Sequence, residues 1–196
     1  HLDLVVGEIL NFLRDQDLIH NTLIIFASDN GGLEVSAATG HRSNGDYREF
    51  KGTVWEGGHR VPLIFSWPGG KVPSGETVDS LTGLQDIYAT LAELTGSQMP
   101  LNQAADSLSF SRQLTSAEAP HRRAMMFQGT KKHSHLAFRL GDLKLMTDMA
   151  MRPVGLYDLG SDLSEQRNLL EDPDFEDDLE RLKVGFAEVY EELLLR

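Results

Sequence analysis

The residues of this chain best suited to chemistry are an adjacent carboxylate and amide, followed later by a lysine. Asp29 and Asn30 end an apolar run and precede two glycines, and Lys51 follows after a polar loop. Adjacent carboxylate and amide oxygens are hard ligands of the kind that Ca²⁺ or Mg²⁺ binds. A lysine ammonium attracts an anion. If these side chains share one pocket, the sequence predicts a metal site that handles a sulfate or phosphate ester.

The first of these motifs has a simpler explanation when it is taken alone. An Asp-Asn-Gly-Gly sequence is typical of a hairpin or loop turn, because Asn and Gly tolerate positive φ. A second motif favours the metal site instead. It runs from Phe50 to Pro62 and reads Phe-Lys-Gly-Thr-Val-Trp-Glu-Gly-Gly-His-Arg-Val-Pro.

The elements around these motifs alternate between helix and strand. Residues 22–27 are short, β-rich and nearly all apolar, which is typical of a strand buried on both faces. An amphipathic helix is expected near residues 2–15, a second strand around 61–67, and a helix near 85–95 that Gly96 ends as its C′ residue. This order indicates an α/β layer.

The pattern changes after Gly96. A polar link leads to three short apolar segments, 124–128, 135–139 and 143–146, which suggest an antiparallel sheet. Asp172 and Pro173 mark the start of a final helix. We therefore predict an α/β domain over residues 1–100, followed over 101–196 by a linker and a small antiparallel β subdomain with a C-terminal helix.

Taken together, the motifs resemble the sulfatase family, the arylsulfatase-like type I enzymes of the alkaline phosphatase superfamily. The resemblance is collinear and extends from the first helix to Asn168-Leu169. Its most specific pieces are Ser-Asp-Asn-Gly at 28–31, Lys-Gly at 51–52, Trp-Glu-Gly-Gly-His-Arg-Val-Pro at 55–62, Trp-Pro-Gly at 67–69 and Leu-Tyr-Asp-Leu at 156–159. The series is highly specific, although any one piece is weak.

The resemblance implies a fold and a set of roles. The fold is the C-terminal part of an alkaline-phosphatase-like mixed sheet sandwiched by helices. Asp29 and Asn30 match the late pair of calcium ligands of the family, and Lys51 matches the lysine that contacts the sulfate group. The implied cofactor is one Ca²⁺ ion. The implied substrate is a sulfated small molecule or carbohydrate, and the implied location is the periplasm or the outside of the cell.

The nucleophile of the family has no match in this chain. In sulfatases a Cys or Ser within a Cys/Ser-x-Pro-x-Arg motif is oxidised to formylglycine, whose hydrate attacks sulfur. The chain has no cysteine and no Ser-x-Pro-x-Arg, and it begins at His1. We therefore expect a C-terminal fragment whose formylglycine lies upstream, which has no catalytic residue of its own and is inactive alone. Two oxygen ligands also predict weak calcium binding, in the ~mM range.

Other residues are weaker candidates for the site. His41 lies in the loop between the metal pair and Lys51, where it would contact substrate or remain a solvated histidine. His133 and His135 lie in a basic turn that reaches the cleft in related folds, so we keep them as substrate-contact candidates. Glu56 to Arg60 look catalytic, but we expect a structural role in which Arg60 pairs with a buried carboxylate.

The composition limits the classes of partner. The net charge of −12 makes nucleic acid an unsuitable partner. Residues 158–196 carry −9 of this charge, which predicts an acidic solvated helix face. No apolar run approaches the ~20 residues that cross a bilayer. The sequence leaves the oligomeric state open.

Two alternatives to a sulfatase remain. One is a phosphomonoesterase or phosphodiesterase of the same superfamily, in which metals and a Thr or Ser nucleophile act on phosphate. The other is a non-catalytic remnant that binds an anion or a carbohydrate.

Overall fold

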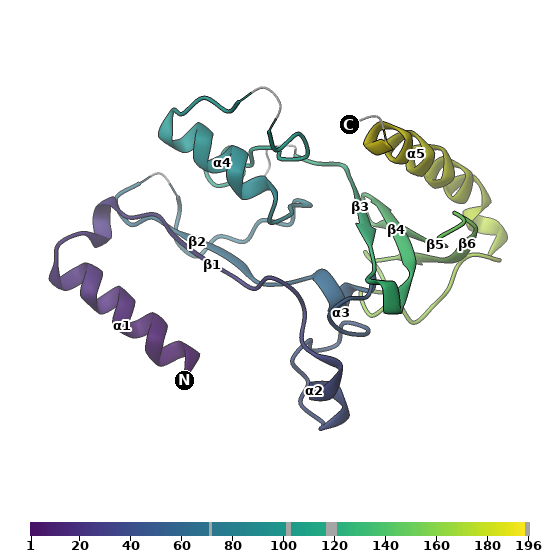
Figure 1. Cartoon of the computed structure of the whole chain (residues 1–196), viewed down its shortest axis with the longest axis horizontal. Helices are drawn as coiled ribbons and strands as arrows, with labels where there is room; N and C mark the ends of the chain where they lie inside the picture. The colour runs from purple at the N-terminus through teal and green to yellow at the C-terminus, as the bar shows by residue number, and fades with distance from the viewer. Residues whose placement is uncertain (71, 101–102, 117–120, 195–196) are drawn as a thin grey trace. The chain divides into compact units, whose positions relative to one another are not determined.

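The chain forms two compact units in the computed structural model, which describes residues 1–70, 72–100, 103–116 and 121–194 (Figure 1). Unit 1 contains His1–Ala27 and Pro62–Arg122, and unit 2 contains Ser28–Val61 and Arg123–Arg196. The division at residue 100 stays a prediction, and residues 101–102 and 117–120 of its linker lie outside the described residues. All the site residues predicted from the sequence belong to unit 2.

Unit 1 contains the helices and strands expected for the first half of the chain. Its elements are α1 (Leu2–Asp15), the 3-10 turn η1 (Ile19–Asn21), β1 (Ile24–Ala27), β2 (Leu63–Ser66) and α4 (Asp86–Thr95). Strands β1 and β2 pair antiparallel, with Ile25 opposite Phe65. Gly96 ends α4 in the left-handed conformation at φ 67°, as predicted.

The buried face of α4 holds the described part of the linker. Asp86, Ala89 and Thr90 are the buried residues of this helix. The Ala89 N–H donates to the Ser107 hydroxyl at 2.9 Å, and the Phe110 N–H donates to the Thr90 hydroxyl at 3.0 Å. Short polar side chains therefore satisfy backbone groups of both segments inside the unit.

Unit 2 is built on a four-stranded antiparallel sheet in the order β3-β4-β5-β6. The strands are β3 (Ala124–Gln128), β4 (His135–Leu140), β5 (Leu143–Asp148) and β6 (Pro153–Asp158), with the 3-10 turn η2 (Lys131–His133) between the first two. The three apolar segments predicted as strands are confirmed, whereas β6 was not predicted. The fold class, α/β with a small antiparallel sheet and a C-terminal helix, is as expected.

The helix α5 (Glu176–Leu194) packs on one face of this sheet (Figure 1). Leu182 and Phe186 of α5 form a buried apolar cluster with Phe138 of β4 and Leu145 of β5. Asp172 caps the 3-10 turn η3 (Pro173–Phe175) that precedes α5, and its carboxylate accepts from the Asp174 N–H at 3.2 Å. The start signal read from the sequence therefore marks this turn.

The opposite face of the sheet contacts the segment that carries the second motif. Val54 joins Ala137, Met146 and Tyr157 in a second buried cluster, and Trp55 packs against it. This segment of unit 2 also contains the short helices α2 (Glu34–Ala38) and α3 (Glu56–His59). The sheet is thus covered on both faces.

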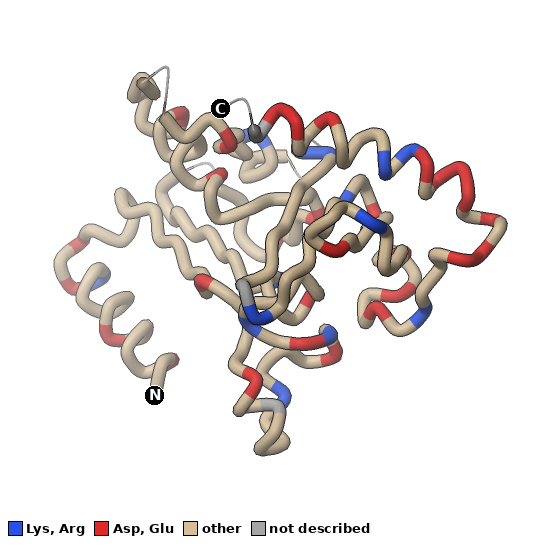
Figure 2. The backbone as a smooth tube through the Cα atoms, turned by 45° about the vertical axis from the view of Figure 1, so that its right-hand side comes forward, with Lys and Arg blue, Asp and Glu red and all other residues tan. Residues whose placement is uncertain are grey.

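The acidic residues of the C-terminal region gather along α5, where Figure 2 shows them in red. Glu176, Asp177, Glu180 and Glu188 are exposed, as expected for a solvated helix face. Within the described residues, no helix is both long and apolar enough to span a bilayer.

Candidate functional site

Two backbone hydrogen bonds bring the metal-pair segment, the lysine segment and α3 together in unit 2. The Gly31 N–H donates to the Gly58 carbonyl oxygen at 3.0 Å, and the Lys51 N–H donates to the Gly32 carbonyl oxygen at 2.9 Å. Asn44 adds a bridge, because its Oδ1 accepts from the Gly32 N–H at 2.6 Å. The backbones that carry Asp29–Asn30 and Lys51 are therefore neighbours.

Glycine is required at the first of these crossings because no side chain fits there. A Cβ atom on Gly31 would lie 1.8 Å from the Gly57 carbonyl oxygen, and one on Gly57 would lie 2.4 Å from the Arg48 carbonyl oxygen. Neither Gly31 nor Gly32 has a positive φ. Asp29 and Asn30 form a bend in the loop after β1, and close approach of backbones, not a positive φ, explains Gly31.

The two predicted metal ligands stand at the edge of this crossing. Asp29 is exposed and Asn30 is partly buried. The Ser28 hydroxyl donates to the Asn30 carbonyl oxygen at 2.9 Å, and the Asn30 amide nitrogen donates to the Gly31 carbonyl oxygen at 3.0 Å. The second contact fixes the Asn30 side chain through its amide nitrogen.

The chemistry of this donor pair fits a hard cation but does not complete its shell. A Ca²⁺ ion takes about 6–8 oxygen ligands. Among the described residues, no group of three or more His, Cys, Asp or Glu side chains is arranged to hold a metal. Any calcium at Asp29 and Asn30 therefore depends on further oxygens from other groups.

The turn between β3 and β4 joins the lysine segment. The Thr130 N–H donates to the Gly52 carbonyl oxygen at 2.9 Å, and the His133 ring meets the Phe50 ring edge-on at 5.5 Å. The Lys132 ammonium pairs with Glu34 at 2.9 Å. His133 thus contacts Phe50, the residue that precedes Lys51 in the chain.

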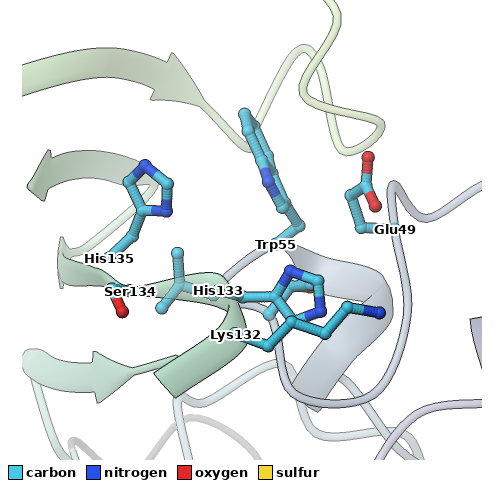
Figure 3. Close-up of a pocket in the computed structure, with 8 residues that line it drawn as sticks. Glu49, Trp55, Lys132, His133, Ser134 and His135 are labelled. Atoms are coloured by element: carbon cyan, nitrogen blue, oxygen red, sulfur yellow. The ribbon is translucent and has the colours of Figure 1, made fainter. Parts of the chain in front are cut away.

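A pocket of about 230 Å³ opens beside this turn (Figure 3). His133 and His135 line it together with Trp55, Lys132 and Glu49, and the remaining lining residues are Thr53, Val54 and Ser134. The two histidines predicted as substrate contacts therefore share one pocket. His41 is exposed, and its backbone N–H donates to the Ser36 carbonyl oxygen at 2.9 Å in the turn after α2.

A buried group of charges connects α3 to the sheet of unit 2. The Lys144 ammonium lies 2.9 Å from Glu56 Oε1 and 2.8 Å from Glu165 Oε1. The three side chains are at most 1% exposed. Arg60 also reaches Glu56 Oε2 at 3.1 Å, so its predicted pairing with a buried carboxylate is confirmed. We call Glu56, Lys144 and Glu165 the buried triad.

The triad and its neighbour His59 have shifted pKa values. Burial alone would raise the pKa of Glu56, but Lys144 and His59 lower it to about 2. Burial and then Lys144 lower the pKa of His59 to about 4. Burial raises the pKa of Glu165 in spite of Lys144. Near neutral pH, Glu56 is therefore charged and His59 neutral.

The sequence reading missed the triad because lysine and glutamate usually face solvent. Glu165 was counted within the acidic solvated region, yet it is fully buried. One signal was present: Lys144 shares a strand face with Met146, which is apolar, and both are buried. Without the position of β6, that face cannot be assigned to the interior.

The sequence model of the Sulfatase family matches residues 1–97. Human arylsulfatase D is 36% identical over 141 residues, which cover 69% of this chain and 23% of that protein. Pig N-acetylgalactosamine-6-sulfatase is 34% identical over 143 residues, which cover 73% of this chain and 27% of that protein. The chain thus spans about a quarter of the length of these curated relatives.

Solved structures give the same picture. A sulfatase from Bacteroides thetaiotaomicron superimposes with a TM-score of 0.80 at 28% identity, over 100% of this chain and 43% of that one. A phosphonate monoester hydrolase of Agrobacterium radiobacter superimposes with a TM-score of 0.68 at 25% identity, over 96% of this chain and 38% of that one. From its sequence match and its fold, the chain belongs to the sulfatase family.

Proposed function

We propose that this chain is the part of a sulfate-ester hydrolase that supplies two calcium ligands and one sulfate-binding lysine. The observation that carries the proposal is the backbone pairing of Lys51 with Gly32, two residues after Asn30, at 2.9 Å. It joins the segment with the oxygen donors to the segment with the ammonium. Family membership gives this combination its meaning, because the relatives are named as sulfatases.

Each residue has a defined task in this proposal. Asp29 and Asn30 donate oxygens to Ca²⁺, and Lys51 places a positive charge against the sulfate oxygens. The exposed position of Lys51 suits contact with a ligand. Calcium, when bound, would supply positive charge that stabilises the developing negative charge of the reacting group. His133 and His135 contact the organic part of the substrate in their pocket, and His41 is a further candidate contact.

The nucleophile belongs to a part of the catalytic domain that this sequence does not contain. The short coverage of the relatives supports this inference, and so does the surface of α1. None of the residues of α1 is buried, and Leu2, Val5, Ile9 and Phe12, which share one face of the helix, are 42–64% exposed. Such an apolar stripe is typical of a helix that packs on further structure. We therefore expect the isolated chain to be inactive.

The function is tested on the whole protein that carries this chain, with 4-nitrophenyl sulfate as substrate. We expect calcium-dependent hydrolysis that is abolished by Asp29→Ala together with Asn30→Ala and strongly reduced by Lys51→Ala. Arg181→Ala, a surface change on α5, is the matched control and should leave the rate unchanged. Hydrolysis that survives the first two changes contradicts the proposal. Turnover by the isolated chain contradicts the assignment of the nucleophile to another segment.

A phosphoester or phosphonate ester hydrolase is the second candidate, favoured by the Agrobacterium neighbour. Assays with 4-nitrophenyl phosphate and a phenyl phosphonate distinguish it from a sulfatase. Faster turnover of either compound than of the sulfate supports this alternative. Sulfate binding at Lys51 with no turnover of any ester by the whole protein indicates a non-catalytic anion-binding or carbohydrate-binding remnant.

A further inference from the structure

We propose that the buried triad of Glu56, Lys144 and Glu165 positions the segments that carry Asp29, Asn30 and Lys51. The inference rests on the proposed function for its meaning, although its geometry stands independently. The triad contacts none of these site residues directly. It acts through α3, which both site segments contact.

The first step is the attachment of α3 to the sheet. Glu56 is the first residue of α3, and its carboxylate is held by Lys144 from strand β5 at 2.9 Å. The Glu56 backbone N–H donates to Glu165 Oε2 at 2.7 Å. Glu165 therefore caps a helix that begins 109 residues earlier. The side chain and the backbone of the same residue are both fixed.

The second step runs from α3 to the site segments. The Gly58 carbonyl oxygen accepts the Gly31 N–H at 3.0 Å, and the Gly57 N–H donates to the Arg48 carbonyl oxygen at 2.8 Å. A Cβ atom on Gly31 or Gly57 would collide with the facing backbone. Both site segments therefore pack directly against the backbone of α3, so we expect a displacement of α3 to displace them as well.

Arg48 and Glu165 give a second, parallel connection. The Arg48 guanidinium donates to the Glu165 carbonyl oxygen at 2.8 Å and stacks on the Trp55 ring at 3.6 Å. Arg48 lies three residues before Lys51. The main chain of Glu165 thus holds the lysine segment while its side chain holds α3.

The backbone of two residues in this assembly is strained. Glu165 has φ 53° and Glu49 has φ 62°, in the left-handed region that residues other than glycine seldom adopt. Such strain persists only where the surrounding contacts impose it, and it gathers at functional sites. Strain at Glu165, which caps α3, and at Glu49, in the lysine segment, is consistent with a role of the triad in positioning these segments.

The cost of the triad gives the same indication. Taking charges out of water is unfavourable, and apolar replacement of a buried ion pair often leaves stability unchanged or improves it. Net stability alone therefore gives no reason for three charges at the centre of unit 2. A reason for burying these charges is that they fix the distance between α3 and the sheet.

The experiment compares three variants of this chain by NMR-detected hydrogen exchange of the Gly31 and Lys51 amides. Glu165→Met removes the cap but leaves the Lys144–Glu56 pair balanced. Glu165→Gln keeps an oxygen that can accept from the Glu56 N–H. Leu182→Ala, a core change on the α5 face, lowers stability without touching α3. Exchange is read under conditions where it proceeds by local opening.

We expect Glu165→Met to accelerate exchange at Gly31 and Lys51 about tenfold, as loss of a well-formed hydrogen bond would. Glu165→Gln should restore most of the protection, and Leu182→Ala should leave these two amides unchanged. Unchanged exchange in Glu165→Met overturns the inference, and so does an equal acceleration in Leu182→Ala. If Glu165→Met does not fold, exchange in Glu165→Gln decides: a moderate acceleration at these two amides supports the inference, and none overturns it.

The readout does not require catalysis, so it separates this inference from the proposed function. In the whole protein, Glu165→Met should lower kcat more than it raises KM, because misplaced site segments affect the reacting group most, and Glu165→Gln should restore most of the rate. A whole protein without sulfatase activity would refute the function and leave the exchange result standing.

Discussion

The two faces of the four-stranded sheet in unit 2 are built on opposite principles. The face beneath α5 is apolar and joins Phe138 and Leu145 to Leu182 and Phe186. The face beneath α3 has buried apolar residues as well, but at its centre Lys144 meets two carboxylates. Apolar contacts are nondirectional, whereas hydrogen-bonded charges demand one geometry. The α5 face thus chiefly stabilises, and the α3 face also orients.

The largest effect that tests this contrast is expected from Lys144→Met. The change leaves Glu165 buried without its cation and takes from Glu56 the buried one of its partners, Arg60 remaining at 3.1 Å, so it should cost about 3–5 kcal/mol of unfolding free energy. Urea denaturation measures the loss. Adding Glu56→Gln and Glu165→Gln removes the uncompensated charges, so this triple variant should recover most of the stability. A loss below about 1 kcal/mol for Lys144→Met would show that the triad is not a buried ionic group.

Leu182→Ala tests the apolar face. Leu182 is fully buried at the centre of the α5 cluster, so its truncation should cost about 3 kcal/mol through lost burial and a residual cavity. Leu182→Met, which nearly conserves volume, should cost less than about 1.5 kcal/mol. The contrast would weaken if Leu182→Ala disturbed the NMR signals of α3 as strongly as a change in the triad.

Gly31→Ala tests the tight crossing above α3. The new Cβ would meet the Gly57 carbonyl oxygen at 1.8 Å, so backbone must move, at a cost of about 2 kcal/mol. Gly7→Ala is the matched control, because Gly7 lies within α1 with nothing within 4 Å of the added atom. Removing this glycine should stabilise by about 0.5–1 kcal/mol. Equal effects at the two positions would refute the close approach.

The smallest predicted effect concerns pH and His59. The pKa of His59 falls from 6.5 to about 4 on folding, so only the unfolded chain gains a proton between these values. Stability should therefore fall as pH decreases from 6.5 toward 4, and His59→Gln should remove about 1 kcal/mol of this loss at pH 5.5. The raised pKa of Glu165 acts in the opposite direction, since it favours folding at low pH.

Thermal unfolding of the wild type and of His59→Gln at several pH values measures the contribution of His59 alone, because both proteins contain Glu165. Parallel pH profiles for wild type and His59→Gln would mean that His59 titrates normally in the folded chain.

The parts of the fold that could be predicted from sequence are those with a local pattern. Helices α1 and α4 follow from apolar periodicity and from the Gly96 stop signal. Strand β1 follows from a short apolar run, and strands β3 to β5 from apolar runs between turns. Strand β6 contains Pro153 and Gly155, which lower its local strand signal and explain why it was missed. Because β6 was not predicted, the strand face that contains Lys144 could not be assigned to the interior.

The candidate site also has a part that could be predicted from the sequence and a part that could not. The chemical types of Asp29, Asn30 and Lys51 were readable from motifs, but the packing of Gly31 on Gly57 requires two segments to meet in space. Glu165 could not be recognised because its partners, Glu56 and Lys144, lie 109 and 21 positions away along the chain. A buried ionic contact between distant segments has no local signature in the sequence.

The most direct test of the account is a titration of this chain with Mn²⁺, observed by NMR. Mn²⁺ binds the same oxygen ligands as Ca²⁺, and it broadens the signals of nearby nuclei. We predict that millimolar Mn²⁺ broadens the signals of Asp29, Asn30 and the Lys51 side chain together, and that Asp29→Ala with Asn30→Ala prevents it. Broadening at the exposed acidic residues of α5 serves as the control for non-specific binding of Mn²⁺. If Asp29 and Asn30 broaden while the Lys51 side chain stays sharp, the two oxygen donors and the ammonium do not share a site, and the account is wrong.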